Sequence, residues 1–508
     1  MSTLGISGDA PSRDLGSYFP GFGEGAPLEL PGLGRDGAAS LASRVIDGSW
    51  GAYSAAASSV SYCSNPIRLH GSSSTVDRAT GEVLTTFSSD SAPLGFLFKA
   101  CGNRREHICP ACSRTYARDT FEMIRAGVTG GKRVPEDVRY NPLIFLTLTA
   151  PSFGHVHRGG AYCRPRRAGD RQFCPHGRPT WCGQHHDEGD ARRGTPLCLS
   201  CYDYVTHVTW QWWAPELWRR FTIELRRQLS SRLGCPEQKL GELASVQFAK
   251  VAEYQTRGVI HFHALIRLDG PSADGIGSPA PASVTVAEFG ALARTSSQRV
   301  QFLAPAAQES PRRLVFGRQV DVKIVRANSR NDEAGAPLRA EQVAGYLAKY
   351  ATKDATNAGG VKRRATAHIR RLRETCVDLH RATTDAWQDA NPYALLGKWE
   401  HSLGFRGHFS TKSRRYSVTL GALRRARVRW QAVAAESRRS GVPIDTDELD
   451  ARLLDEDETA TTLVVGSWTY AGSGWLEPGD AELALAAASR AREYDRWRFE
   501  RTTDSTVG

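Results

Sequence analysis

The sequence lacks any run of apolar residues that approaches the ~20 needed for a membrane helix. It also lacks the Gly-x-x-x-x-Gly-Lys-Ser/Thr pattern of a nucleotide-binding loop, because the nearest candidate, residues 127–133, has neither the spacing nor the hydroxyl. The first absence argues against a membrane-spanning segment. The second argues against a fused, ATP-driven helicase motor.

Lysine is scarce as well, since only ten of the 66 basic residues are lysine and the others are arginine. With 54 acidic residues the formal net charge is +12. Such an excess fits a protein that binds phosphate groups, although solvated arginines alone would give the same excess. Hydrophobic residues make up 40% of the 508 positions, so the chain can bury the cores of two or three domains.

The eleven cysteines include two Cys-x-x-Cys pairs, at 109–112 and 198–201, a spacing typical of zinc-binding knuckles. No apolar signal segment opens the chain, so we expect a cytoplasmic protein with reduced thiols, which favours metal thiolates over disulfides. We therefore predict two structural Zn²⁺ sites. The first would use Cys63, Cys101, Cys109 and Cys112, and the second would draw on Cys174, His176, Cys182, Cys198 and Cys201.

The second zinc site has alternative ligands, because Cys163, His185 and His186 lie in the same segment. Residues 164–193 are too rich in glycine, proline and charge to build a core of their own. We expect bound zinc to fold this segment as an insert. Two further cysteines stand alone and are interpreted as ordinary thiols: Cys235 and Cys376.

A strand with two histidines is predicted at residues 259–266, which are apolar and often β-branched apart from His261 and His263. Alternation along a strand sends both imidazoles to one face. Residues 246–253 predict a second strand, and residues 255–258 between the two predict a turn that contains glycine. The pattern therefore indicates a β-hairpin.

The midpoint of this hairpin lies near Arg257, so Glu253 should lie opposite His261 and share its face. Two imidazoles and a carboxylate would then converge on one open metal site. Such a set suits Mg²⁺ or Mn²⁺, and zinc would accept the same ligands. The alternative is that His261 and His263 are half-exposed strand residues without an ion.

Two tyrosines lie four positions apart in the run 338–353, so a helix would stack the phenols of Tyr346 and Tyr350 on one face. Lys349 and Lys353 would lie close by. A tyrosine is a poor nucleophile at its ordinary pKa of roughly 10. Attack on phosphorus therefore needs a metal ion and a lysine to stabilise the developing charge. The alternative is an amphipathic helix that buries its tyrosines.

Three segments, in order along the chain, resemble the three motifs of the HUH endonuclease superfamily: 145–149 (Phe-Leu-Thr-Leu-Thr), 261–263 (His-Phe-His) and 346–353 (Tyr-Leu-Ala-Lys-Tyr-Ala-Thr-Lys). The last segment is similar to that of the phage gene A initiators, which carry Tyr-x-x-x-Tyr. Tyr350 with Lys353 also fits the single-tyrosine pattern of plasmid Rep proteins. More closely, residues 63–416 look like the rolling-circle Rep initiators of actinobacterial plasmids and integrative elements.

The resemblance implies an α+β protein with the HUH endonuclease fold, in which a central antiparallel sheet of about five strands carries flanking helices and zinc-binding insertions. It also implies an initiator that nicks one strand at the double-strand origin. The enzyme would keep the 5′ phosphate on a tyrosine and leave a 3′ hydroxyl as primer. A host helicase and a DNA polymerase would be its partners, because no helicase motor is expected in this chain.

The resemblance also assigns roles to residues. Tyr350 is the leading nucleophile, because it satisfies both tyrosine patterns, and Tyr346 is a second nucleophile for the closing step. Residues 145–149 form a mostly structural strand below the site. The ligands of the catalytic Mg²⁺ or Mn²⁺ are His261, His263 and Glu253.

Composition and motif positions predict four regions: a flexible N-terminal region (1–60), a zinc-binding module with four cysteines (61–135), the nicking domain with a zinc-binding insert at 160–205 (136–425), and a helical C-terminal region (426–508). We expect the insert to contact DNA. Residues 401–416 form a basic segment, for which we expect a β-rich structure. We expect contacts with the DNA backbone from its cations Arg406, Lys412, Arg414 and Arg415.

Two other functions fit parts of the pattern. A HUH transposase can combine a zinc module with Tyr-x-x-x-Tyr in the same motif order, and its gene would lie between transposon ends. A non-catalytic, zinc-containing DNA-binding regulator would bind an origin without cleaving it. The histidines, the glutamate and the tyrosines are all in place, which favours the initiator over the regulator.

Overall fold

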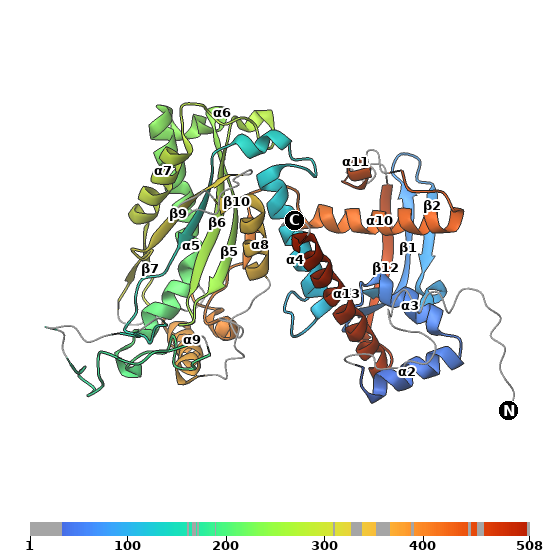
Figure 1. Cartoon of the computed structure of the whole chain (residues 1–508), viewed down its shortest axis with the longest axis horizontal. Coiled ribbons are helices and arrows are strands. Elements are labelled where there is room, and N and C mark those ends of the chain that lie inside the picture. Colours follow the sequence, from blue (N-terminus) through green and yellow to red (C-terminus); the bar gives the residue numbers. More distant parts are fainter. Residues whose placement is uncertain are drawn as a thin grey trace. The chain divides into compact units, whose positions relative to one another are not determined.

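A computed structural model of the chain describes residues 33–159, 162–164, 169, 172–187, 189–307, 310–326, 338–351, 366–387, 391–445, 449–454 and 462–504. The chain divides into two compact units (Figure 1). One unit is formed by residues 1–118 together with 455–508, and the other by residues 119–454. The two ends of the chain therefore share a unit, whereas the composition predicts four regions in linear order.

The first unit is built on an antiparallel sheet in which one strand pairs with all three others. Its strands are β1 (Ile67–Asp77), β2 (Val83–Ser88), β3 (Leu97–Lys99) and β12 (Thr462–Ser473). The longest pairing joins β1 to β12, from Ile67 opposite Ser473 to Asp77 opposite Thr462. The predicted helical region 426–508 thus contains a strand that completes the sheet of the N-terminal segment.

The helices of the first unit are joined by a buried ion pair. Helix α2 (Arg35–Ile46) packs against helix α13 (Pro478–Asp504). The guanidinium of Arg44 donates to both carboxylate oxygens of Asp480, at 2.6 and 2.5 Å, and Asp480 is fully buried. The hydroxyl of Tyr53 donates to the backbone carbonyl of Asp480 at 2.8 Å.

These contacts correct part of the expected flexible region 1–60. Helices α2 and α3 (Trp50–Ser59) both lie within it, because the buried pair and the apolar side of α3 attach them to the core of this unit. The first 32 residues of the region lie outside the described residues.

The second unit is organised around a sheet with the strand order β10-β9-β4-β6-β5-β11. Neighbouring strands are antiparallel except β10 and β9, which are parallel. This mostly antiparallel sheet confirms the predicted α+β class. The edge strands β10 and β11 have only two and three residues. The other four described strands of this sheet are longer. The strands are β4 (Leu143–Leu148), β5 (Ser245–Tyr254), β6 (Ile260–Asp269), β9 (Val320–Arg326), β10 (Leu338–Arg339) and β11 (Ser410–Lys412).

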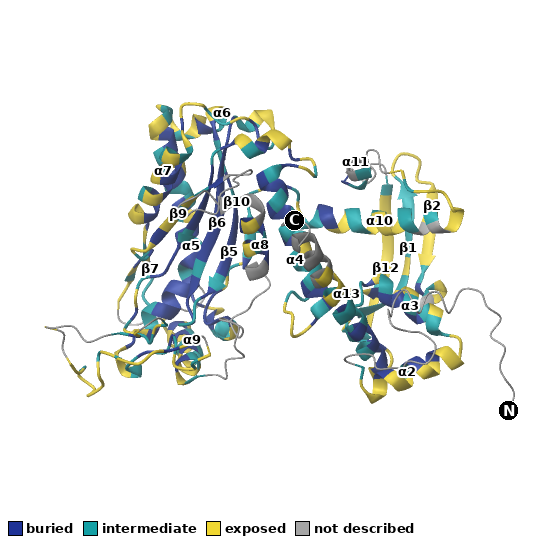
Figure 2. Ribbon diagram, in the orientation of Figure 1, coloured by how far each residue is buried: buried dark blue, intermediate teal, exposed yellow. Residues whose placement is uncertain are grey.

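One face of this sheet is covered by the long helix α5 (Tyr204–Leu233). The side chain of Asp203 caps its first turn, and Gly234 ends it in the left-handed conformation, with φ of 66°. Trp218 of α5 packs on Phe262 of β6, with 5.7 Å between the ring centroids. Strand β6 is buried along almost its whole length (Figure 2), so the core of the unit lies between α5 and this strand.

The opposite face of the sheet carries helix α8 (Ala340–Ala351), which packs against β5. Among the described residues, no helix combines the length and the apolar character needed to cross a membrane. The other described helices and strands of this unit are α6 (Leu240–Leu243), α7 (Val286–Arg299), β7 (Gln301–Ala304), β8 (Arg312–Val315), α9 (Ala367–Trp387), α10 (Leu420–Ser440) and α11 (Leu449–Leu454), and α4 (Pro110–Thr129) is divided between the units.

Breaking the ion pair between α2 and α13 should destabilise the first unit. In Asp480→Ala the buried guanidinium of Arg44 loses its carboxylate partner, a change that costs about 3–5 kcal/mol in comparable buried pairs. Arg492→Ala is the matched control, because its ion pair with Glu106 is exposed to solvent and should be worth about 0–1 kcal/mol. Hydrogen exchange should show a large loss of amide protection in α2 for Asp480→Ala alone. Equal protection in the two variants would contradict this account.

Candidate functional site

The site lies on the β5–β6 hairpin, whose register is the predicted one. Glu253 is paired with His261 across the two strands. The chain turns at residues 255–258, where Gly258 has a φ of 79°, a conformation that favours glycine. Because side chains alternate along a strand, Glu253, His261 and His263 project from the same face.

Three ligand-type atoms converge at this face. Oε2 of Glu253 lies 3.0 Å from Nε2 of His261 and 3.2 Å from Nε2 of His263, and the two Nε2 atoms are 3.0 Å apart. We call these three residues the triad. One carboxylate and two imidazoles at such distances could hold a metal ion, and three protein ligands leave coordination positions open.

Two members of the triad, Glu253 and His263, are already in the protonation states that a metal needs. Burial tends to raise the pKa of Glu253, but hydrogen bonds with His261 and His263 outweigh this effect and lower the pKa to about 2. Burial also lowers the pKa of His263 below its ordinary value. At pH 7 the carboxylate is therefore ionised and the buried imidazole neutral, so this carboxylate and imidazole need lose no proton when an ion binds.

Strand β4 orients His263 from below. The hydroxyl of Thr147 lies 3.0 Å from Nδ1 of His263, and the ring of Phe145 stacks on the same imidazole, with 5.5 Å between centroids and 8° between planes. A partner on Nδ1 directs Nε2 toward the other ligands. The resemblance implies a mostly structural role for this segment, and the contacts with His263 add an orienting one. The alternation of Phe145 and Thr147 on one face was the available signal for the orienting contacts.

Helix α8 brings a tyrosine to the triad. The hydroxyl of Tyr346 lies 3.2 Å from Nε2 of His263, and its ring meets that imidazole edge to face, at 5.1 Å and 84°. Phe145 supports the same ring at 6.0 Å. Tyr346 is 37% exposed, so the phenol reaches the triad from a side that is open to solvent.

The other predicted residues of the tyrosine segment are less fully described. Tyr350 lies on α8 one turn after Tyr346, which agrees with the predicted helix. The side chains of Tyr350 and Lys349 lie outside the described residues, and so does the whole of Lys353. The roles of these three residues stay predictions.

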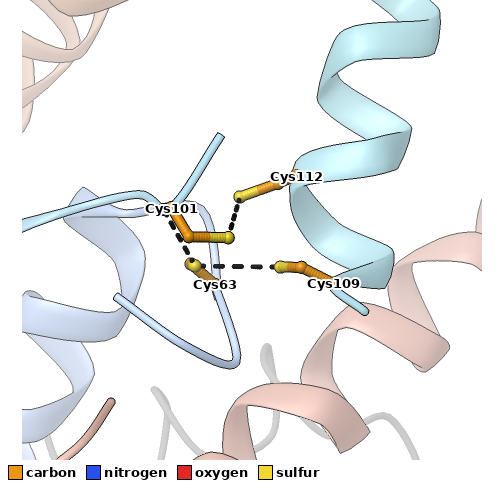
Figure 3. Close-up of side chains that lie close together, drawn as sticks. All are labelled: Cys63, Cys101, Cys109 and Cys112. Atoms are coloured by element: carbon orange, nitrogen blue, oxygen red, sulfur yellow. Dashed lines mark hydrogen bonds between the residues drawn. The ribbon is translucent and has the colours of Figure 1, made fainter. Parts of the chain in front are cut away.

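The four cysteines predicted for the first zinc site do come together (Figure 3). The sulfur atoms of Cys101 and Cys112 lie 3.7 Å apart, as do those of Cys63 and Cys109. Cys109 lies just before α4 and Cys112 lies in its first turn, whereas the other two come from loops of the same unit. All eleven cysteines are free thiols, so this group could hold a metal ion such as zinc.

The second predicted zinc site needs a correction, because its segment contains two groups of ligands. Cys182 does not join the other four predicted ligands but lies with Cys163 and His186, which were alternatives, and with His157, which the sequence analysis missed. His185 is in neither group and faces Asp187. The groups are Cys174, His176, Cys198 and Cys201, and His157, Cys163, Cys182 and His186.

The basic segment 401–416 is less available to DNA than expected. Lys412 is turned inward and donates to the backbone carbonyls of residues 413, 414 and 417, at 2.8 to 3.3 Å. Burial lowers its pKa to about 8. Arg406 stacks over the ring of Trp212 at 4.4 Å. Arg406, Arg414 and Arg415 are all exposed, so Lys412 alone of the four predicted DNA-contacting cations is turned inward.

Comparison with known proteins finds a family model and a curated protein that match most of this chain. A model of the family described as "RepSA: Replication initiator protein, pSAM2" matches residues 49–489 of this chain. A curated protein from Streptomyces ambofaciens, named replication initiator protein, is 40% identical over 438 residues, which cover 84% of this chain and 86% of that protein. No solved structure matches the chain.

Removing the orienting hydroxyl should weaken metal binding at the triad. Thr147→Val keeps the shape of the side chain but leaves Nδ1 of His263 without its hydrogen-bond partner, and we expect the affinity for Mn²⁺ to fall about 10- to 100-fold. The matched control is Thr149→Val, because that hydroxyl donates to the carbonyl of Gln319 instead. Titration calorimetry with Mn²⁺ measures both. Unchanged affinity in Thr147→Val would show that the hydroxyl does not orient the ligand.

Proposed function

This chain belongs to the RepSA family of replication initiator proteins, and from that premise we propose that it is a HUH endonuclease that starts rolling-circle replication by nicking one strand of its origin. The observation that carries the proposal is the contact between the hydroxyl of Tyr346 and Nε2 of His263, at 3.2 Å, beside Glu253 and His261. A nucleophile and a set of metal ligands next to each other are what phosphodiester cleavage requires.

The triad would hold Mg²⁺ or Mn²⁺. Its carboxylate and two imidazoles suit either ion, and their convergence within 3.2 Å fits a single ion between them. When bound, the ion would polarise the scissile phosphate and offset the charge that develops on it. Thr147 and Phe145 keep His263 in its ligand orientation, and Glu253 keeps its negative charge throughout.

The tyrosine makes the nick by transesterification. Its phenolate oxygen attacks the phosphorus, a new bond forms from that oxygen to phosphorus, and the bond from phosphorus to the 3′ oxygen breaks. The leaving oxygen takes up a proton and becomes the 3′ hydroxyl that primes synthesis, while the 5′ phosphate stays on tyrosine. The reverse transfer closes the strand, and no outside energy source is needed because one ester replaces another.

Two tyrosines are available for the two transfers. The pattern shared with Lys353 assigns the first attack to Tyr350, and Tyr346 would then receive the strand in the closing step. The contact of Tyr346 with His263 supports the opposite order, since that phenol already adjoins a metal ligand. Both orders use one helix and one metal site.

The rest of the protein would serve DNA binding. The net charge of +12 and the exposed Arg406, Arg414 and Arg415 fit contacts with the phosphate backbone. Zinc in the cysteine-containing groups would be structural, and the insert before α5 would contact DNA. A host helicase and a DNA polymerase in the cytoplasm would complete the replication cycle.

Covalent adducts with DNA test the proposal directly. Purified protein with Mn²⁺ is incubated with single-stranded oligonucleotides that tile its own replicon, and adducts are resolved on a denaturing gel. We expect an adduct for the wild type and for the control Tyr140→Phe, whose phenol is exposed elsewhere in the unit, and none for Tyr350→Phe. Loss in Tyr346→Phe instead would assign the first attack to that residue.

If the wild type forms no adduct on any tile with any divalent ion, yet still binds duplex origin DNA, a non-catalytic regulator is the better description. Cleavage at transposon ends rather than at an origin would favour a transposase.

Loss of the triad carboxylate should abolish cleavage without unfolding the protein. Glu253→Gln keeps the size of the side chain but removes the negative charge that binds the ion, so we expect the adduct to disappear and Mn²⁺ binding to be lost. Glu242→Gln, at an exposed position, is the control and should behave as wild type. Adduct formation by Glu253→Gln at the wild-type rate would exclude the carboxylate as a ligand.

A further inference from the structure

The segment between β4 and α5 contains two four-residue ligand groups whose members alternate along the chain. The first pair, His157 and Cys163, belongs to one group, and the next pair, Cys174 and His176, belongs to the other. The third pair, Cys182 and His186, returns to the first group, and the fourth pair, Cys198 and Cys201, to the second. We propose that this segment is a cross-braced module with two structural Zn²⁺ ions, one of them bound by His157, Cys163, Cys182 and His186.

The distances within this first group suit one tetrahedral ion. Nδ1 of His157 lies 3.0 Å from Nε2 of His186, and the two sulfur atoms lie 3.6 and 3.5 Å from their nearest imidazole nitrogens. Around a tetrahedral Zn²⁺, with bonds of about 2.0 Å to nitrogen and 2.3 Å to sulfur, ligand atoms lie about 3.3–3.8 Å apart. The two sulfur–nitrogen distances match this range, and the two nitrogens would move apart by about 0.3 Å to hold the ion. The group is closed, since Cys163 and His186 are buried, which is typical of a structural site.

A carboxylate behind His186 fixes the direction of its ligand atom. Oδ2 of Asp190 lies 2.6 Å from Nδ1 of His186, so the ring carries its proton there and Nε2 presents its lone pair to the group. Asp190 is held in turn by the guanidinium of Arg192 at 2.8 Å. Carboxylate, imidazole and metal in this order are a common arrangement at zinc sites.

The module needs the ions because it has almost no other structure. Between β4 and the start of α5, the described residues form one short 3₁₀ turn (Leu199–Cys201) and isolated bridges, such as Val156 with Pro196 and Arg164 with Cys182. Because the pairs alternate, the loop closed by the first ion contains ligands of the second. Each ion therefore restricts the chain that must bind the other.

The module also supports the hairpin that carries the triad. Gly194, with φ of 82°, lies so close to the turn that a Cβ there would be 2.5 Å from the carbonyl of Thr256. In the same turn, the guanidinium of Arg257 donates to the carbonyls of Ala150 and Pro151, at 3.0 and 2.9 Å. A module ordered by bound metal would therefore keep Gly194 against the turn of the β5–β6 hairpin, which connects Glu253 to His261.

Zinc content tests the first site. Elemental analysis of the full-length protein should give one zinc per chain fewer for His157→Ala than for wild type. The matched control His185→Ala changes an exposed neighbour that belongs to neither group and should keep the wild-type content. Equal content in His157→Ala and wild type, or the same loss in His185→Ala, would overturn the proposal. Zinc counting uses no DNA, so its outcome is independent of the proposed nicking activity.

Conservative variants separate ligand loss from misfolding. His157→Cys should keep the wild-type zinc content, and with Co²⁺ in place of zinc it should gain thiolate charge-transfer absorption, because the five cysteines of the two groups would become six. Asp190→Asn should keep the content but release one zinc to a chelator at about 10- to 100-fold lower competitor concentration. No gain in absorption in His157→Cys would exclude residue 157 as a ligand.

The cross-brace itself is tested by the zinc that remains. In His157→Ala, the ion held by Cys174, His176, Cys198 and Cys201 should be lost to a colorimetric chelator faster than in wild type, because the loop between its ligand pairs is no longer closed. Release at the wild-type rate would mean two independent sites and would contradict the cross-brace.

Discussion

The register of the β5–β6 hairpin is the constraint on which the candidate site depends. Glu253 lies opposite His261, and the two faces of this strand pair have different uses, one facing α5 and the other carrying the triad. A slip of one residue would exchange the faces. If β5 slipped in this way, Glu253 would point into the aromatic core, away from His261 and His263. Gly258 at positive φ and the hydrogen bonds of Arg257 fix the turn that prevents this.

The two faces treat charge in opposite ways. On the α5 side, Lys250 is buried with its ammonium 4.3 Å above the ring of Phe262 and 5.3 Å from that of Trp218, and burial lowers its pKa to about 7. Three positions along the same strand, the hydrogen bonds from two imidazoles keep the pKa of Glu253 at about 2. On its closed face, strand β5 therefore disfavours the protonated form of Lys250. On its open face it favours the ionised form of Glu253, which could bind a metal ion.

Short-range patterns predicted the hairpin, its register and the triad, because each depends on alternation or on local spacing. In the four-cysteine group, only the pair Cys109 and Cys112 has a local spacing of this kind. Long-range pairing was not visible in this way. Nothing near Ile67 indicates that its strand partner is Ser473. The two ligand groups of the insert were merged for a related reason: their members alternate in sequence, and the six-residue step from His157 to Cys163 is not a knuckle spacing. The inward turn of Lys412 likewise depends on carbonyl groups that only the folded chain brings to it.

The chemistry proposed for this protein draws on two different kinds of support. The metal ligands lie on paired strands, whose backbone hydrogen bonds fix them, whereas the tyrosines lie on α8, which depends on packing against β5. Residues four apart on a helix present side chains about 6 Å apart on one face. Because the proposed cleavage and closing are the same ester exchange in opposite directions, one metal site could serve both phenols. Metal ligands fixed by paired strands therefore suit the proposed reaction, in which one bond would be made, held during synthesis and then reversed.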